Sequence, residues 1–135
     1  MESSYSYLGP SLEEFSSSIG MAMAANDKSL AMRLFIQLND NLSSASLFHK
    51  LAMCEKDPGL TGSLEYDALI AGLVEYHLRQ TEFSIPSWVF GEDRSVDSPW
   101  FFEYIAIDQV GIKLSTPSCF AQRNIFIRET ELMSV

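Results

Sequence analysis

The side chains that could carry out acid–base or metal chemistry in this chain are few and widely spaced. Its two histidines, His49 and His77, belong to no recognised ligand motif. None of the patterns G-x-S-x-G, H-E-x-x-H, G-x-G-x-x-G or the P-loop occurs. We therefore interpret both histidines as structural or solvated. We expect a non-enzymatic protein with no catalytic residues, no metal ligands and no cofactor.

Asp67 and Glu75 are the strongest polar candidates, because acids in an almost continuous apolar run must lie at an exposed edge or be paired when buried. Eight helical residues at about 100° each place them roughly 80° apart, on one side of a helix at two levels. Glu75 also stands four residues before Arg79, so we interpret it as half of a helix-surface ion pair. For Asp67 we expect a structural role near the helix start, bonding the following loop.

Aromatic residues concentrate between Phe83 and Tyr104, where seven of the sixteen occur. Such a cluster can form a ligand pocket, a partner-binding patch or the core beneath an irregular segment. We interpret most of these rings as core. A binding role would fall to an exposed minority of them, with Arg94 beside them. The cluster comprises Trp88, Phe90, Trp100, Phe101, Phe102 and Tyr104.

Helical periodicity predicts the elements that must position these residues. Ser11 can cap a first helix that ends near Asn26, and Asn26-Asp27 can cap a second. Residues 39–41 (Asn-Asp-Asn) indicate a turn or a kink before a third helix from Leu42, which residues 56–59 end. Whether the second and third helices form one bent rod stays open.

Residues 63–80 predict a central helix, because apolar residues cover most of its circumference. Gly72 inside it indicates close approach of a neighbouring helix. After Phe83, prolines and glycines predict short helices and turns; residues 100–107 fit a helix or a strand, 124–127 an extended segment and 129–133 a last turn. The expected fold is mainly α: a flexible arm over residues 1–9, then one helical bundle of about four to six helices over 10–135, with an irregular, aromatic-rich C-terminal third.

Composition indicates a folded, acidic protein. The 135 residues fit one domain, and 47% of them are hydrophobic. Nine Lys and Arg stand against 18 Asp and Glu, which disfavours direct nucleic-acid binding. Residues 61–103 hold eight acids against Arg79 and Arg94, so this region would suit a basic partner. The alternative is that excess acid only keeps the protein soluble.

The remaining composition signals favour a cytoplasmic protein. Cys54 and Cys119 have no CxxC or CxxH neighbour, so we interpret both as small buried hydrophobes. No basic region followed by a long apolar stretch opens the chain, and no uncharged apolar run approaches the roughly 18 residues of a membrane span. We expect no membrane association.

Four short segments together resemble a group of small, mostly uncharacterised bacterial proteins that are frequent in actinobacteria. The segments are Thr61–Tyr76 (TGSLEYDALIAGLVEY), Pro86–Trp88 (PSW), Pro99–Phe101 (PWF) and Pro117–Ile127 (PSCFAQRNIFI). In many members the corresponding domain follows a helix-turn-helix of the Xre repressor type, and some lie beside nucleotidyltransferase-like toxin genes, as antitoxins do. The resemblance implies a partner-binding or regulatory module.

This chain departs from the fused form of the family, because its N-terminal part is acidic and has no Arg or Lys before residue 28. The positions that match the family pattern are Asp67, Glu75, Trp88, Trp100, Phe120 and Arg123. The residues that we predict to contact a partner are Asp67, Glu75, Trp88, Arg94, Trp100, Phe101 and Arg123.

Three functional hypotheses follow. The first is an antitoxin-like component that binds and neutralises a protein partner, such as a basic toxin enzyme. The second is a component of a transcriptional regulator that acts as a homodimer or through a DNA-binding companion. The third is a small-ligand-binding protein or an unrecognised enzyme, which requires Asp67, Glu75 or His77 to converge with Arg123 in a pocket.

Overall fold

Six α-helices form most of the part of the chain that the structure describes. The computed structural model describes residues 9–103 and 107–133 and is 61% helical. The α-helices are α1 (Leu12–Ala24), α2 (Lys28–Ser44), α3 (Leu47–Cys54), α4 (Leu64–Leu78), α5 (Gln109–Ser115) and α6 (Ser118–Ala121). The predicted mainly-α class is confirmed. The arm expected over residues 1–9 lies, except for Gly9, outside the described residues.

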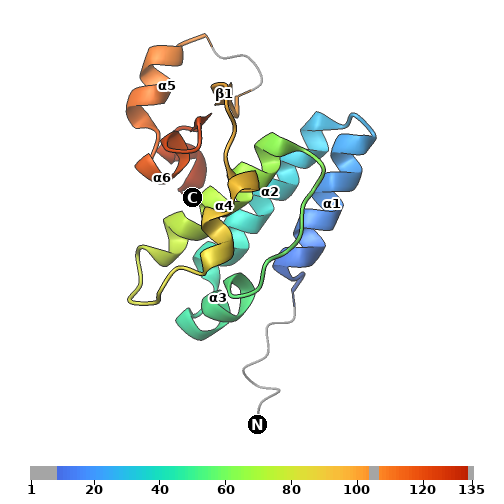
Figure 1. The fold of residues 1–135 in the computed structure, drawn as a ribbon, viewed down its shortest axis with the longest axis vertical. Coiled ribbons are helices and arrows are strands. Elements are labelled where there is room, and N and C mark those ends of the chain that lie inside the picture. Colours follow the sequence, from blue (N-terminus) through green and yellow to red (C-terminus); the bar gives the residue numbers. More distant parts are fainter. Residues whose placement is uncertain (1–8, 104–106, 134–135) are drawn as a thin grey trace.

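The start of α1 illustrates how local sequence sets the helix boundaries. Ser11 Oγ accepts a hydrogen bond from the Glu14 backbone N–H at 3.1 Å, and Glu14 Oε1 accepts one from the Ser11 N–H at 2.9 Å. This capping box satisfies two backbone donors at the helix start. After α1, Asn26 adopts a φ of 59° and Asp27 caps α2. α1 and α2 then pack side by side (Figure 1).

α2 runs without a break through residues 39–41, so the turn that the sequence indicates there is wrong. Asn39 is buried, and its side chain bonds to His77 of α4 and to the Leu132 carbonyl near the C-terminus. Because these bonds satisfy the amide inside the fold, it does not compete with the helix backbone. The chain turns after α2 instead, and Ser46 caps α3. α2 and α3 are therefore two helices, and the third helix begins at residue 47, not 42.

α4 is the central helix, as its apolar sequence predicts. All of its residues except Leu64, Glu65 and Tyr76 are buried, because α2, α3, α6 and two short helical turns pack around it. A Cβ at Gly72 would lie 2.7 Å from Cδ1 of Phe120, which belongs to α6. The predicted close approach of a neighbouring helix at Gly72 is confirmed.

The chain after α4 is irregular, as expected. It contains the 3₁₀ helices η2 (Ser87–Phe90), η3 (Glu92–Arg94) and η4 (Glu129–Leu132) and the strands β1 (Trp100–Phe101) and β2 (Ile125–Phe126). The two strands pair in parallel, with Trp100 opposite Ile125. Residues 100–101 are thus a strand, whereas 104–106 lie outside the described residues. β2 confirms the extended segment predicted over 124–127 for Ile125 and Phe126, whereas Asn124 is a turn residue with a φ of 62°. η4 confirms the last turn.

Helix α5 lies at one end of the molecule, and α3 lies at the other (Figure 1). Asp108 caps α5 by accepting a hydrogen bond from the Gly111 N–H at 3.0 Å. Ile112 is buried beneath the helix but is not part of the main apolar cluster around α4. Thr116 Oγ1, just after α5, accepts a bond from the Ile127 N–H at 3.1 Å. α5 is therefore held by a small local contact and lies outside the main core.

Candidate functional site

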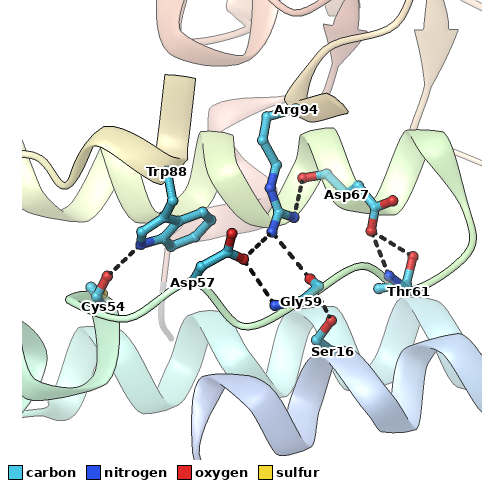
Figure 2. Close-up of polar contacts among 8 residues, drawn as sticks. All are labelled: Ser16, Cys54, Asp57, Gly59, Thr61, Asp67, Trp88 and Arg94. Carbon is cyan, nitrogen blue, oxygen red and sulfur yellow. Dashed lines mark hydrogen bonds and ion pairs between the residues drawn. The ribbon is translucent and has the colours of Figure 1, made fainter. Parts of the chain in front are cut away.

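Arg94 lies at the centre of a buried cluster that joins η3, α4 and the loop before α4 (Figure 2). Its Nη1 donates to the Asp67 carbonyl at 3.2 Å, and its Nη2 donates to the Asp57 carboxylate at 2.9 Å and to the Gly59 carbonyl at 3.1 Å. The guanidinium also lies over the Trp88 ring, 4.8 Å from its centroid. Only 2% of Arg94 is exposed. Its charge therefore holds the loop against α4, in contrast to the partner contact predicted for it.

Asp67 fixes the other side of the same loop (Figure 2). Its Oδ1 accepts hydrogen bonds from the Thr61 N–H at 2.7 Å and from Thr61 Oγ1 at 2.8 Å. The loop is tied to α1 as well, since Ser16 Oγ donates to the Gly59 carbonyl at 3.3 Å. The structural role expected for Asp67 is confirmed, but the loop that it bonds precedes α4 and does not follow it. Asp67 is buried, and the partner contact predicted for it stays a prediction.

Arg123 and Glu75 form a second buried cluster, on the C-terminal half of α4. Arg123 Nη1 donates to Glu75 Oε1 at 2.7 Å and to the Cys119 carbonyl at 2.6 Å, and Nη2 donates to the Val89 carbonyl at 2.9 Å. Arg79 Nε donates to Glu75 Oε2 at 2.6 Å. The predicted pair of Glu75 with Arg79 exists. However, Glu75 is only 1% exposed, so its interpretation as a surface pair is wrong.

The buried charges of the two clusters cancel in number. Among the described residues, those that are buried and carry a formal charge are Asp67, Glu75, Arg94 and Arg123, two of each sign. Glu75 and Arg123 form an ion pair, whereas Arg94 pairs with the more exposed Asp57 and the Asp67 carboxylate accepts its hydrogen bonds from Thr61. None of these charges is therefore buried without a polar partner. The net charge of −9 is therefore carried by the remaining charged side chains.

A small pocket of about 170 Å³ opens beside both arginines. Its lining residues are Val89, Phe90, Gly91, Arg94, Ser95, Gln122 and Arg123. Arg123 lies 5.8 Å from the centroid of the Phe90 ring, which is largely exposed. Asp67, Glu75 and His77 do not line this pocket. Glu75 does meet Arg123, but it is not itself among the residues that line the pocket, so the convergence that a ligand site would require is not formed in this pocket.

His77 is buried on α4 and holds Asn39. The His77 Nε2 and Asn39 Oδ1 atoms are 2.8 Å apart. Asn39 Nδ2 donates to the Leu132 carbonyl, which fixes the amide so that Oδ1 faces the ring and His77 Nε2 acts as donor. Burial, and secondarily the charge of Lys50, lowers the pKa of His77 to about 4. The structural interpretation of His77 is confirmed.

The aromatic residues of the C-terminal third divide between core and surface. Phe102 is buried, and Trp88 and Trp100 pack against the core. Trp88 Nε1 also donates to the Cys54 carbonyl at 3.0 Å (Figure 2). Phe101 is half-buried against Phe126, with ring centroids 5.3 Å apart. The core interpretation holds for most of the cluster; Phe90 is the exposed exception, and Tyr104 lies outside the described residues.

Both cysteines are buried, as interpreted from their apolar contexts. Burial raises the pKa of the Cys54 thiol to about 12. Burial, together with the negative charge of Glu75, raises that of Cys119 to about 11. These thiols therefore stay protonated and are poor nucleophiles near neutral pH.

The surface feature that sequence reasoning missed is an apolar stripe on and before α5, formed by Ile107, Val110 and Leu114. These residues are 90%, 70% and 83% exposed. Their spacing of three and four residues is the sequence signal that could have found them.

Comparisons with known proteins complete this description. No family model matches the chain, and neither the curated proteins nor the solved structures gave a significant match. Within residues 9–103 and 107–133, no three His, Cys, Asp or Glu side chains gather as they would around a metal ion. In the same residues, no helix combines the length and the apolar character needed to span a bilayer.

Proposed function

We propose that this protein is a non-catalytic binding module that recognises a basic protein partner in the cytoplasm. The observation that carries the proposal is the placement of charge: the buried charges cancel within the fold, and the net charge of −9 is left to the other side chains. A surface of this kind attracts a cationic partner and speeds the encounter.

The segment between α4 and β1 gives this surface a specific location. Glu82, Glu92, Asp93 and Asp97 are exposed there, whereas Arg94, the basic residue among them, is buried. Arg79, at the end of α4, is exposed but already pairs with Glu75. The acids that face the solvent in this segment therefore have little compensating charge.

The family resemblance refines the proposal towards an antitoxin-like role. The partner would be a toxin enzyme whose basic, substrate-binding surface the acidic protein covers. Trp88 and Arg123 support this role indirectly, because they tie η2, which directly precedes the exposed Glu92 and Asp93, to the rest of the fold. Glu75 in turn pairs with Arg123, and Asp67 holds the loop before α4. The alternative of a transcriptional regulator has no specific structural observation in its favour.

The direct test is capture of the partner from the native host. The tagged protein is expected to retain one stoichiometric protein with an excess of Lys and Arg at low ionic strength and to release it at high ionic strength. Mass spectrometry identifies this protein, and its expression without the tagged protein is expected to slow growth. Retention of no stoichiometric partner, or of an acidic one, contradicts the proposal.

A charge-neutralised variant provides the control. Glu92→Gln combined with Asp93→Asn and Asp97→Asn removes three exposed charges and leaves both buried clusters intact. Because these side chains are exposed, the thermal midpoint should change little. Retention of the partner should fall, and unchanged retention at every ionic strength would show that these acids take no part in binding.

A further inference from the structure

Val110 and Leu114, two members of the apolar stripe, lie on the face of α5 that points away from the fold, and the third, Ile107, directly precedes the cap residue Asp108. At about 100° per residue, Val110 and Leu114 lie roughly 160° from Ile112 in opposite directions around the helix. Ile112 is fully buried, so the stripe must face the solvent, as the exposures of 70% for Val110 and 83% for Leu114 show. α5 is therefore apolar on two opposite faces, and only one of them packs against the rest of the chain.

Exposing this stripe carries a free-energy cost that other surface residues at these positions would avoid. Removing a Val, Leu or Ile side chain from water is favourable relative to leaving it exposed. Three such side chains close together, two on a short helix and one just before it, are more than the scattered exposed apolar residues of an ordinary surface. A partner that covers them would remove this cost.

The charges beside the stripe indicate the chemistry of that partner. Asp108 directly follows Ile107, and its carboxylate is 64% exposed. Its cationic neighbour, Arg128, lies 3.7 Å away but forms its shorter ion pair, at 2.8 Å, with Glu103. One guanidinium thus serves two carboxylates at the Ile107 end of the stripe, whereas Lys113, beside Leu114 on α5, supplies a positive charge at the other end.

We propose that the stripe of Ile107, Val110 and Leu114 is the docking site for an amphipathic, basic segment of the protein partner, whose apolar side chains cover the stripe while its Lys or Arg side chains meet Asp108 and Glu103 at the Ile107 end. This rests on the proposed function and names the site and the chemistry of its partner. Helical segments commonly dock in this way, with anchors three or four residues apart.

A second copy of the chain fits this site less well. Each copy carries a net charge of −9, so two copies repel each other. Three side chains are also far fewer than the roughly 20–30 residues that each partner contributes to a standard interface. A short segment with cationic side chains can bind over a smaller buried area. The negative charge that makes two copies repel each other attracts such a segment.

The first experiment titrates the full chain with a fluorescent peptide of about 15 residues that places leucine on one helical face and lysine on the other. The wild type should bind it, and Val110→Gln combined with Leu114→Gln should weaken the affinity by about tenfold or more. A peptide with serine in place of leucine should bind the two proteins equally and weakly. Equal affinity of the wild type and the stripe variant for the leucine–lysine peptide overturns the proposal.

The matched control lies on α3, at the opposite end of the molecule (Figure 1). Leu47 and Phe48 are 60% and 68% exposed, so Leu47→Gln combined with Phe48→Gln removes a comparable apolar area from another helix. This variant should bind the peptide as the wild type does. An equal loss in both variants would show that any exposed apolar pair serves and would overturn the assignment to α5. Circular dichroism and thermal melts check that both variants keep the fold.

The second experiment separates this inference from the proposed function. The capture from the host is repeated with the stripe variant. If the wild type and the stripe variant both retain a basic partner, the proposed function stands and the docking site on the stripe is overturned. If only the wild type retains it, the result supports both the proposed function and the docking site. If neither protein retains a partner, the function fails, and the peptide titration still decides the site. A dimer of the wild type in sedimentation that the stripe variant dissociates would make a second copy the occupant and overturn the proposal.

Discussion

Arg123 Nη1 lies 2.7 Å from Glu75 Oε1, and neither side chain is exposed. This pair joins the central helix to the turn between α6 and β2, 48 residues further along the chain. Breaking a buried ion pair by removing one partner is far more costly than losing an exposed pair, because the remaining charge stays buried without compensation.

Glu75→Gln should therefore lower the free energy of unfolding by about 3–5 kcal/mol, since it leaves Arg123 without a counter-charge. Arg79→Met should lower it by at most about 1 kcal/mol, because Arg79 is mostly exposed and Glu75 keeps its bond to Arg123. Urea denaturation measures both values. If both variants lost the same free energy of unfolding, the buried pair of Glu75 and Arg123 would contribute no more to stability than the exposed contact of Arg79.

Arg94→Lys should also destabilise the fold, by about 1–3 kcal/mol. The guanidinium of Arg94 reaches Asp57, Gly59 and the Asp67 carbonyl together, and a lysine ammonium cannot span these three acceptors. Arg33→Lys is the matched control, because Arg33 is exposed on α2. Thermal unfolding of both variants gives the comparison, and a shift for Arg94→Lys no larger than that for Arg33→Lys would be evidence against this role.

The helices could be predicted from sequence because their signals are local. The cap at Ser11 and the apolar run of α4 lie within the elements that they define. The break predicted at residues 39–41 is absent because the contacts that stabilise the helix there are not local. The partners that stabilise Asn39 inside α2 are His77 and Leu132, which lie 38 and 93 residues away.

The candidate site shows the same limit. Glu75 and Arg79 could be paired from their spacing of four residues, but the burial of Glu75 depends on Arg123, which only the folded chain brings near. The sequence predicts a partner contact for Arg94 beside the exposed rings, but Arg94 is buried. Its partners Asp57 and Gly59 lie 37 and 35 residues earlier in the chain, beyond the reach of any local pattern.

Gly72→Ala should destabilise the protein although alanine is the better helix former. The gain in helix propensity is about 1 kcal/mol. Against it, the new Cβ would lie 2.7 Å from Cδ1 of Phe120, whose ring is fully buried and has little room to move. Overpacking of this kind costs about 1–3 kcal/mol, so the net effect should be a lower melting temperature. In a Phe120→Leu background, Gly72→Ala should be less destabilising, because the smaller side chain removes part of the overlap. A rise in stability for Gly72→Ala alone would contradict the packing argument.

Stability should fall as the pH drops from 6.5 towards 4, and His77 should account for part of the loss. Burial holds the pKa of His77 at about 4 in the folded chain, against its ordinary value of 6.5. Between these values the unfolded chain binds a proton that the folded chain does not, so protons favour unfolding; below about pH 4 both states are protonated and the effect levels off. The full effect is about 3 kcal/mol.

The variant His77→Gln isolates this effect from that of the carboxylates. A glutamine amide can still donate to Asn39 Oδ1, which accepts from the His77 ring in the wild type, but it does not titrate. The free energy of unfolding of the variant, measured by urea denaturation from pH 7 to pH 4, should decline less than that of the wild type. Parallel pH profiles for the two proteins would mean that His77 is protonated as readily in the folded chain as in the unfolded one, and that its burial in the fold is not maintained in solution.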